Sequence, residues 1–212
     1  MELKGIIFDL DGVICFTDEY HYQAWKKLAD KLGIYFDRQI NNRLRGVSRM
    51  ASLEIILERY NGPALTQSDK EQLAEEKNAF YRTLLGQMTP ADLSDEVKNT
   101  LDQLRQKGLK LAIGSSSKNA PYILERISLA DYFDAVSDGN NITRSKPDPQ
   151  VFQLAAEYLG LDPSACLVVE DAVAGAEAGH AAGMRVACVG DAAAAGAGDY
   201  NLNTFRELLE II

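Results

Sequence analysis

The chain has 212 residues, and 46% of them are hydrophobic, which is enough for one substantial core with a smaller second domain. Its formal net charge of -9 argues against a nucleic-acid partner, because binding to a phosphate backbone needs clustered Lys and Arg. We find neither a signal peptide nor an apolar run of membrane length, so we expect a cytoplasmic protein with no membrane partner.

The first predicted element is a buried strand, residues 5–8, that ends in two carboxylates, Asp9 and Asp11. Taken alone, the pair could be a turn signal, since Asp and Gly often follow strands. Residues 19–34 then carry apolar side chains at helical spacing, and Gly33 ends the pattern. On that helix we expect one of Tyr22 and Trp25 to pack and the other to face a cleft.

Two more helices are predicted at residues 48–60 and 67–85. The second has a candidate capping box, in which Ser68 and Glu71 satisfy each other's backbone donors. Residues 16–88 are therefore predicted to be wholly helical.

From Ser94 onward, helices alternate with apolar strands. The predicted helix and strand pairs are 94–108 with 109–114, 118–129 with 133–138, 148–161 with 166–171, and 172–184 with 185–190. This alternation predicts a parallel sheet covered on both faces. The first strand must join that sheet, so the fold class is α/β: a core of residues 1–15 and 89–212 with an inserted all-helical cap of residues 16–88.

Two other features carry no predicted function. Residues 190–201 are rich in Ala and Gly and are predicted as a flexible loop or a weak helix before a last helix at 202–212. The three cysteines, Cys15, Cys166 and Cys188, lie in or beside apolar runs and are predicted to be buried thiols.

Polar residues follow the predicted strands at the edge of the sheet where ligands bind in open parallel sheets. The set comprises Asp9, Asp11, Ser115 to Lys118, Lys146, Glu170 and Asp171. Carboxylates this close raise each other's pKa, so the group calls for a metal ion, a shared proton, or both, and an all-oxygen set favours Mg²⁺. With a lysine and a serine hydroxyl, the set forms a cradle for a phosphoryl group.

Two other features, the turn after the strand at 109–114 and His21, also have simpler interpretations. Residues 114–119, "GSSSKN", could be only a helix cap, because Ser and Asn are preferred there. A lone histidine such as His21 is usually an ordinary packing or surface residue.

Four motifs, "DLDGVI" from Asp9, "GSSSKN" from Gly114, "SKPDP" from Ser145 and "VVEDAVAG" from Val168, resemble those of the haloacid dehalogenase superfamily, in the same order. The resemblance implies a Rossmann-like core. Three further segments, "DEYHYQAW", "LRGVSRMASL" and "EEKN", resemble the helical cap of the sugar-phosphate mutases in that superfamily. Phe16, where an acidic residue is usual, and Arg45, where lysine is common, depart from the pattern.

The resemblance implies that Asp9 is a nucleophile that forms an aspartyl phosphate and that Asp11 is the general acid and base. Mg²⁺ would be held by Asp9, the backbone carbonyl of Asp11, Glu170 and Asp171. Ser115 and Lys146 would hold the transferring phosphate. The residues implied to bind the sugar and the distal phosphate are Thr17, His21, Trp25, Gly46, Val47, Ser48, Arg49, Ser52, Lys77, Ser116, Ser117, Lys118 and Asn119.

The implied activity is isomerisation of β-glucose 1-phosphate to glucose 6-phosphate through a bound bisphosphate. The alternative is a sugar-phosphate phosphatase on the same scaffold, with water as the acceptor. A binding module without activity would need a lost nucleophile or metal ligand, and none is missing from the sequence. We expect a monomer whose partner is a small sugar phosphate.

Overall fold

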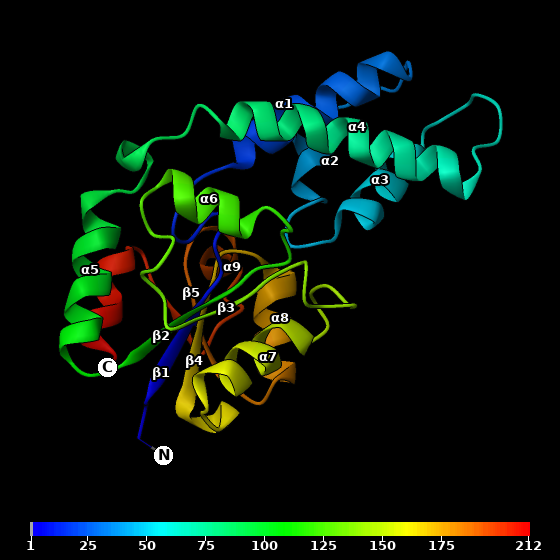
Figure 1. Cartoon of the computed structure of the whole chain (residues 1–212). Coiled ribbons are helices and arrows are strands. Elements are labelled where there is room, and N and C mark those ends of the chain that lie inside the picture. Colours follow the sequence, from blue (N-terminus) through cyan, green and yellow to red (C-terminus); the bar gives the residue numbers. More distant parts are fainter. Residues whose placement is uncertain (1) are drawn as a thin grey trace.

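The computed structural model describes residues 2–212 and contains one six-stranded sheet (Figure 1). The strands are β1 (Gly5–Phe8), β2 (Lys110–Gly114), β3 (Ala135–Ser137), β4 (Cys166–Glu170), β5 (Arg185–Cys188) and β6 (Tyr200–Asn201). Their order is β3-β2-β1-β4-β5-β6, and all neighbours are parallel, as predicted. β1 therefore lies between β2 and β4, which places the residues after it near the middle of the sheet edge.

Successive side chains of each strand point to opposite faces of the sheet. Both faces are apolar, so helices cover both of them. Ile6 and Phe8 of β1 pack into one apolar cluster, whereas Ile7 packs into the other. The first cluster includes residues of α5 (Asp95–Gln106), α6 (Ala120–Arg126) and the 3₁₀ helix η3 (Phe205–Glu210). The second includes residues of α7 (Gln150–Leu159), α8 (Val173–Ala181) and α9 (Gly190–Ala194). Two short 3₁₀ turns, η1 (Pro90–Asp92) and η2 (Pro163–Ala165), precede α5 and β4.

The insertion forms a helical block, which we define as α1 to α4 with their connecting loops, and it lies beyond one end of the sheet (Figure 1). Its helices are α1 (Asp18–Lys31), α2 (Arg38–Asn42), α3 (Arg49–Leu57) and α4 (Gln67–Leu85). Trp25, Leu53 and Ile56 belong to an apolar cluster of the block itself. Tyr81 and Leu85 of α4 belong instead to the cluster on the sheet, so the block also packs against the core.

The capping box of α4 was predicted at the wrong residues. Thr66 is the N-cap: its hydroxyl accepts the Asp69 N–H at 3.2 Å, and Asp69 Oδ2 accepts the Thr66 N–H at 2.8 Å. Thr66 and Asp69 have the same spacing as Ser68 and Glu71, so the local pattern fits both pairs. The N-cap of α4 is therefore two residues earlier than Ser68, the predicted N-cap.

Three other elements differ from the prediction. The short helix α2 was not predicted, and its N-cap is Asp37, whose side chain accepts the Ile40 N–H. In residues 190–201 the short helix α9 agrees with the weak-helix alternative, but the strand β6 that follows it at the edge of the sheet was not predicted. The last helix is a 3₁₀ helix, η3. These elements are short, and tertiary contacts outweigh weak local propensity over such lengths.

The three cysteine side chains are buried and free, as predicted. Among residues 2–212 no helix combines the length and the apolar character that crossing a bilayer demands.

Candidate functional site

The residues that follow the central strands meet at one edge of the sheet because the strands are parallel and in register. Asp9 follows β1, and its N–H donates to the Val169 carbonyl of β4 at 2.9 Å. Ser115 follows β2, and its N–H donates to the Ser137 carbonyl of β3 at 3.0 Å. Glu170 is the last residue of β4. The predicted convergence of these side chains is therefore present.

Three carboxylates form a tight cluster around Lys146. One oxygen from each of Asp9, Glu170 and Asp171 lies within 4.8 Å of the others. Lys146 Nζ lies 2.5 Å from Asp9 Oδ1 and also donates to Glu170 Oε1. Glu170 Oε2 accepts the backbone N–H groups of Asp171 at 2.9 Å and Ala172 at 3.0 Å. The buried charges are thus partly compensated by one cation and two backbone donors.

Two glycines leave room for these carboxylates. A Cβ atom added at Gly12, which has a φ of 89°, would overlap the Asp171 carboxylate. A Cβ atom at Gly175 would overlap the Glu170 carboxylate. The glycines after Asp11 and within "AVAG" therefore allow the backbone and the carboxylates to approach each other closely.

Burial and mutual repulsion make full ionisation of the cluster unfavourable. Burial, then the charges of Asp9 and Glu170, raise the pKa of Asp171 to about 8. Burial also raises the pKa of Glu170, although Lys146 opposes the shift. Burial disfavours the charged form of Lys146, but Asp9 and Glu170 outweigh it and raise the pKa of Lys146.

The donor set fits a divalent magnesium ion. The available atoms are carboxylate oxygens, which are the ligands that Mg²⁺ prefers. A cation among them would offset the repulsion that raises the pKa of Asp171. The cluster brings together three of the four predicted metal ligands, Asp9, Glu170 and Asp171.

Asp11 faces the helical block rather than the cluster around Lys146. Its Oδ1 accepts a hydrogen bond from the Thr17 hydroxyl. Burial and then the charge of Asp9 raise the pKa of Asp11 to about 7, against the effects of Thr17 and Lys146. The carboxyl can therefore exchange a proton near neutral pH.

The helical block contributes a buried basic group opposite Asp11. Lys77 Nζ lies 3.0 Å from His21 Nδ1, and it lies over the rings of Trp25 and Tyr81 at 4.5 Å and 4.4 Å from their centroids. Burial and then the charge of Arg49 lower the pKa of Lys77, while Asp11 opposes the shift. Burial, Lys77 and Arg49 lower the pKa of His21. His21 is therefore a half-buried partner of Lys77 and not an ordinary surface residue.

Trp25 is both packed and adjacent to the cavity, because its indole is 2% exposed and yet lines the site. Tyr22, its predicted alternative, stacks on Phe36 with ring centroids 5.8 Å apart.

The turn after β2 is held by its own hydroxyls. Ser115 Oγ accepts the Ser117 N–H at 3.1 Å, and Ser117 Oγ accepts the Asn119 N–H at 3.2 Å. Within the described chain, Ser116 Oγ is buried without a hydrogen-bond partner. Asn119 is the N-cap of α6 but makes no side-chain capping bond. The helix-cap interpretation of this turn is therefore insufficient for Asn119.

Asn119 instead joins the core to the helical block. Its Nδ2 donates to Asn78 Oδ1 at 3.0 Å, and its Oδ1 accepts from Arg82 Nη1 at 3.0 Å. Both partners lie on α4. The amide is thus engaged between the two parts of the chain.

A second contact between the two parts lies at residues 45–49. Arg45 Nη1 lies 2.6 Å from Asp191 Oδ2 of α9, and Arg45 Nη2 lies 3.2 Å from Asp18 Oδ2 of α1. Gly46 lies against Ala172, because an added Cβ atom would come within 3.7 Å of the Ala172 Cβ. Ser48 is the N-cap of α3, with its hydroxyl accepting the Ala51 N–H at 3.2 Å.

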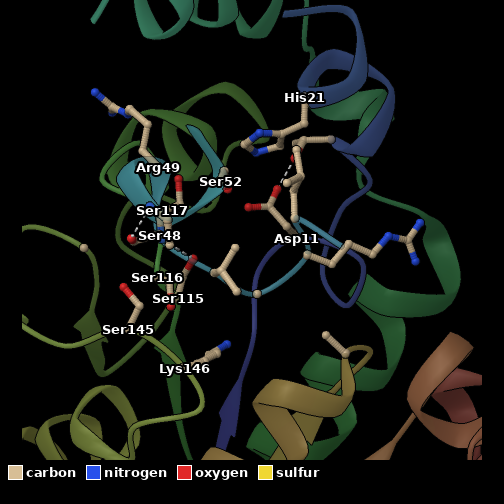
Figure 2. A pocket seen from close by; sticks show the side chains of 18 of the residues that line it. Asp11, His21, Ser48, Arg49, Ser52, Ser115, Ser116, Ser117, Ser145 and Lys146 are labelled. Carbon is tan, nitrogen blue, oxygen red and sulfur yellow. Dashed lines mark hydrogen bonds between the residues drawn. The ribbon is translucent and has the colours of Figure 1, made fainter. Parts of the chain in front are cut away.

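A cavity of about 1070 Å³ lies between the helical block and the edge of the sheet. Figure 2 shows Ser115 and Lys146 on one side of this space and His21 and Arg49 on the other. Every residue predicted for the site lines it: Asp9, Asp11, Thr17, His21, Trp25, Gly46, Val47, Ser48, Arg49, Ser52, Lys77, Ser115, Ser116, Ser117, Lys118, Asn119, Lys146, Glu170 and Asp171.

Some lining residues were not predicted to belong to the site. Tyr81, Asn78 and Glu75 lie on α4, and for Tyr81, four residues after Lys77, helical spacing was an available signal. Phe16 and Arg45, noted as departures from the family pattern, also line the cavity, and the Phe16 side chain is 73% exposed.

Comparison with known proteins agrees with these observations. The haloacid dehalogenase-like hydrolase family matches residues 3–183. The chain belongs to this family. The haloacid dehalogenase-like motifs noted in the sequence are the ones that carry the carboxylate cluster, the hydroxyl turn and Lys146.

Three relatives within this family are informative. A protein of Bacillus subtilis named beta-phosphoglucomutase is 43% identical over 190 residues, covering 89% of this chain and 84% of the relative. A fructose-1-phosphate phosphatase of Escherichia coli is 34% identical over 183 residues, covering 85% of this chain and 93% of the relative. A crystal structure of beta-phosphoglucomutase from Clostridium difficile superimposes with a TM-score of 0.91 at 35% identity, covering 97% of this chain and 93% of that one.

Proposed function

We propose that this protein is a magnesium-dependent phosphomutase that interconverts β-D-glucose 1-phosphate and glucose 6-phosphate. The reaction would proceed through an aspartyl phosphate on Asp9 and through β-glucose 1,6-bisphosphate. The observation that carries the proposal is a cavity with cationic groups at both ends, Lys146 beside Asp9 and Arg49 on the helical block. A bisphosphate needs two such ends. The 43% identity to a protein named beta-phosphoglucomutase supports the same assignment.

The predicted division of the chain becomes part of this proposal. Residues 16–88 would form the cap, and residues 1–15 with 89–212 would form the core, with Met1 outside the described residues. The cap would close over the bound sugar and exclude water from the aspartyl phosphate. A monomeric state and a cytoplasmic location stay predictions from the sequence.

In the first half of the reaction, an Asp9 carboxylate oxygen attacks the phosphorus of the bisphosphate. The new bond is between Asp9 and phosphorus, and the bond between phosphorus and the sugar oxygen breaks. Asp11 gives its proton to that leaving oxygen, which its pKa of about 7 allows. Ser115 and Lys146 would hold the oxygens of the transferring phosphoryl group.

In the second half, after transfer of the 1-phosphate, glucose 6-phosphate leaves, and β-glucose 1-phosphate presents its 6-hydroxyl to the aspartyl phosphate. Asp11, now ionised, accepts the hydroxyl proton while the hydroxyl oxygen attacks phosphorus and Asp9 leaves. Thr17, which donates a hydrogen bond to Asp11, would keep the carboxylate directed at this oxygen. The bisphosphate must then bind in the opposite orientation, with its second phosphate on Arg49 and Lys118.

Asp9, the Asp11 carbonyl, Glu170 and Asp171 would hold Mg²⁺. The ion would neutralise negative charge on the phosphoryl oxygens.

Phosphorus NMR tests the assignment directly. The purified protein is incubated with Mg²⁺, β-glucose 1-phosphate and a trace of the 1,6-bisphosphate, and we expect the glucose 6-phosphate resonance to grow. If only the resonance of inorganic phosphate grows, the protein is a phosphatase and the mutase assignment is wrong. The E. coli fructose-1-phosphate phosphatase, at 34% identity, is the observation that keeps this second candidate.

A further inference from the structure

Glu75 is a carboxylate at the Arg49 end of the cavity, and the role inferred for it rests on the proposed function of Arg49 as a ligand of the distal phosphate. Arg49 Nη1 lies 3.2 Å from Glu75 Oε2. Both residues line the cavity. The guanidinium therefore already has an anionic partner from within the chain.

The other titratable side chains that interact with Arg49 are basic ones, Lys77 and His21. Burial is the main cause that lowers the pKa of Arg49, and Glu75 is the group that opposes this shift. Arg49 in turn lowers the pKa of Lys77 and of His21. Glu75 thus compensates the charge of Arg49, which a phosphate would also compensate.

The geometry makes Glu75 and a phosphate alternatives for the same donors. Figure 2 shows the Arg49 guanidinium directed away from Ser115 and Lys146. Glu75 Oε1 also accepts a hydrogen bond from Asn78 Nδ2 at 3.4 Å, which holds the carboxylate on the face of α4 that carries Asn78. A phosphate bound at Arg49 must displace Glu75 or share the guanidinium with it, and two anions sharing one cation repel each other.

We propose that Glu75 is a positioning residue that competes with the distal phosphate for Arg49 and so weakens the binding of doubly phosphorylated sugars. The effect is modest because the Glu75 side chain is 70% exposed and the Arg49 side chain 26% exposed. Exposed ion pairs contribute little, so releasing Arg49 should tighten binding by up to about fivefold. A mutase must release and rebind its bisphosphate in each cycle, and a weaker distal site favours that exchange.

The test compares Glu75→Gln with Glu71→Gln. Glu71 lines the same cavity one helical turn earlier, where its Oε1 accepts from Gln67 Nε2 at 3.0 Å. Both substitutions remove one negative charge from α4, but only Glu75→Gln removes the ion pair with Arg49. The difference between the two variants therefore isolates the pair from the general field.

Binding of β-glucose 1,6-bisphosphate is measured by calorimetry in an Asp9→Asn background, in which phosphoryl transfer is blocked. We expect Glu75→Gln to lower the Kd about three- to fivefold and Glu71→Gln to change it by less than about twofold. The gain should disappear in about 0.5 M salt, because screening weakens an exposed pair. A third variant, Glu75→Gln with Arg49→Ala, should show no gain over Arg49→Ala alone.

Equal Kd changes in Glu75→Gln and Glu71→Gln, or no change in the first, would overturn the proposal. So would a gain that persists without Arg49. The phosphorus NMR experiment on the wild type tests the mutase assignment separately, so a wrong assignment and a wrong role for Glu75 give different results.

Discussion

Removing the buried cation of the carboxylate cluster should destabilise the protein in a pH-dependent way. In Lys146→Met the apolar length of the side chain is kept, but Asp9 and Glu170 lose their ion-pair partner. The Lys146 side chain is 1% exposed, and those of Asp9 and Glu170 are 10% and 1% exposed. Breaking a buried pair costs about 3–5 kcal/mol, because the remaining charges lie unpaired.

The sign of the pH dependence follows from the carboxyl groups. Without Lys146, the folded-state pKa of Glu170, already raised by burial, should rise further. A carboxyl with a raised folded-state pKa keeps a proton that the unfolded chain has lost, so stability falls as pH rises from the unfolded pKa toward the folded one. Each such group contributes up to about 1.4 kcal/mol per pH unit in this window. The gap between variant and wild type should therefore widen from pH 5 to pH 8.

The assay is thermal unfolding of both proteins in a chelator, at pH 5 and at pH 8. For a chain of this length, about 3–5 kcal/mol corresponds to a fall in Tm of roughly 6–20 °C at pH 8. Added Mg²⁺ should recover part of the loss at pH 8, because a divalent cation can compensate the same carboxylates.

The control is Lys26→Met, which removes an exposed ion pair with Asp30 and should cost less than about 1 kcal/mol. An equal loss in the two variants would refute the reasoning. So would a loss for Lys146→Met that is the same at pH 5 and pH 8, since the cost would then not come from ionised carboxylates.

The remaining predictions concern activity and ligand binding. Asp9→Asn should lower mutase turnover by about a thousandfold or more and weaken Mg²⁺ binding, since an amide is neither a nucleophile nor an anionic ligand; near-normal turnover would contradict the role of Asp9. Asp11→Asn should cost about a hundredfold or more in turnover but retain more Mg²⁺ affinity than Asp9→Asn, and equal losses of affinity would refute this division of roles. Arg49→Ala should lower kcat/KM for β-glucose 1-phosphate about 10- to 150-fold, as expected for hydrogen bonds to a charged group, while hydrolysis of a small aryl phosphate changes little; an equal loss on both substrates would favour a phosphatase. A double-mutant cycle on Arg45 and Asp191, with KM for the sugar phosphate as the readout, should give a coupling of about 0.2–1 kcal/mol that disappears at high salt, and additive effects would exclude a link between the helical block and α9.

Local sequence patterns predicted most of the fold and the part of the site that lies at the carboxyl ends of the strands. The strand Gly5–Phe8 and residues 166–169 of β4 are apolar because both of their faces are buried, and this shows directly in the sequence. Parallel strands put their carboxyl ends at one edge, so Asp9, Ser115 and Glu170 could be placed together from their positions alone.

Short elements and their exact ends were decided by tertiary structure. Helix α2 has five residues, too few to produce a periodic pattern, and it forms where Ile40 packs into the cluster of the helical block. The strand β6 has two residues, and it exists because it pairs with β5. The choice between Thr66 and Ser68 as a cap depended on where α4 begins, which the local pattern leaves open.

The contacts across the cavity were likewise beyond the sequence. The Arg49–Glu75 and Arg45–Asp191 pairs join residues 26 and 146 positions apart. Asn119 fits a capping position, yet its amide bonds to α4, because the folded chain brings a better set of partners within reach. Sequence spacing determines which side chains lie directly after the ends of the strands. Only folding determines which charges they meet there, because electrostatic and hydrogen-bond partners are chosen by distance in space.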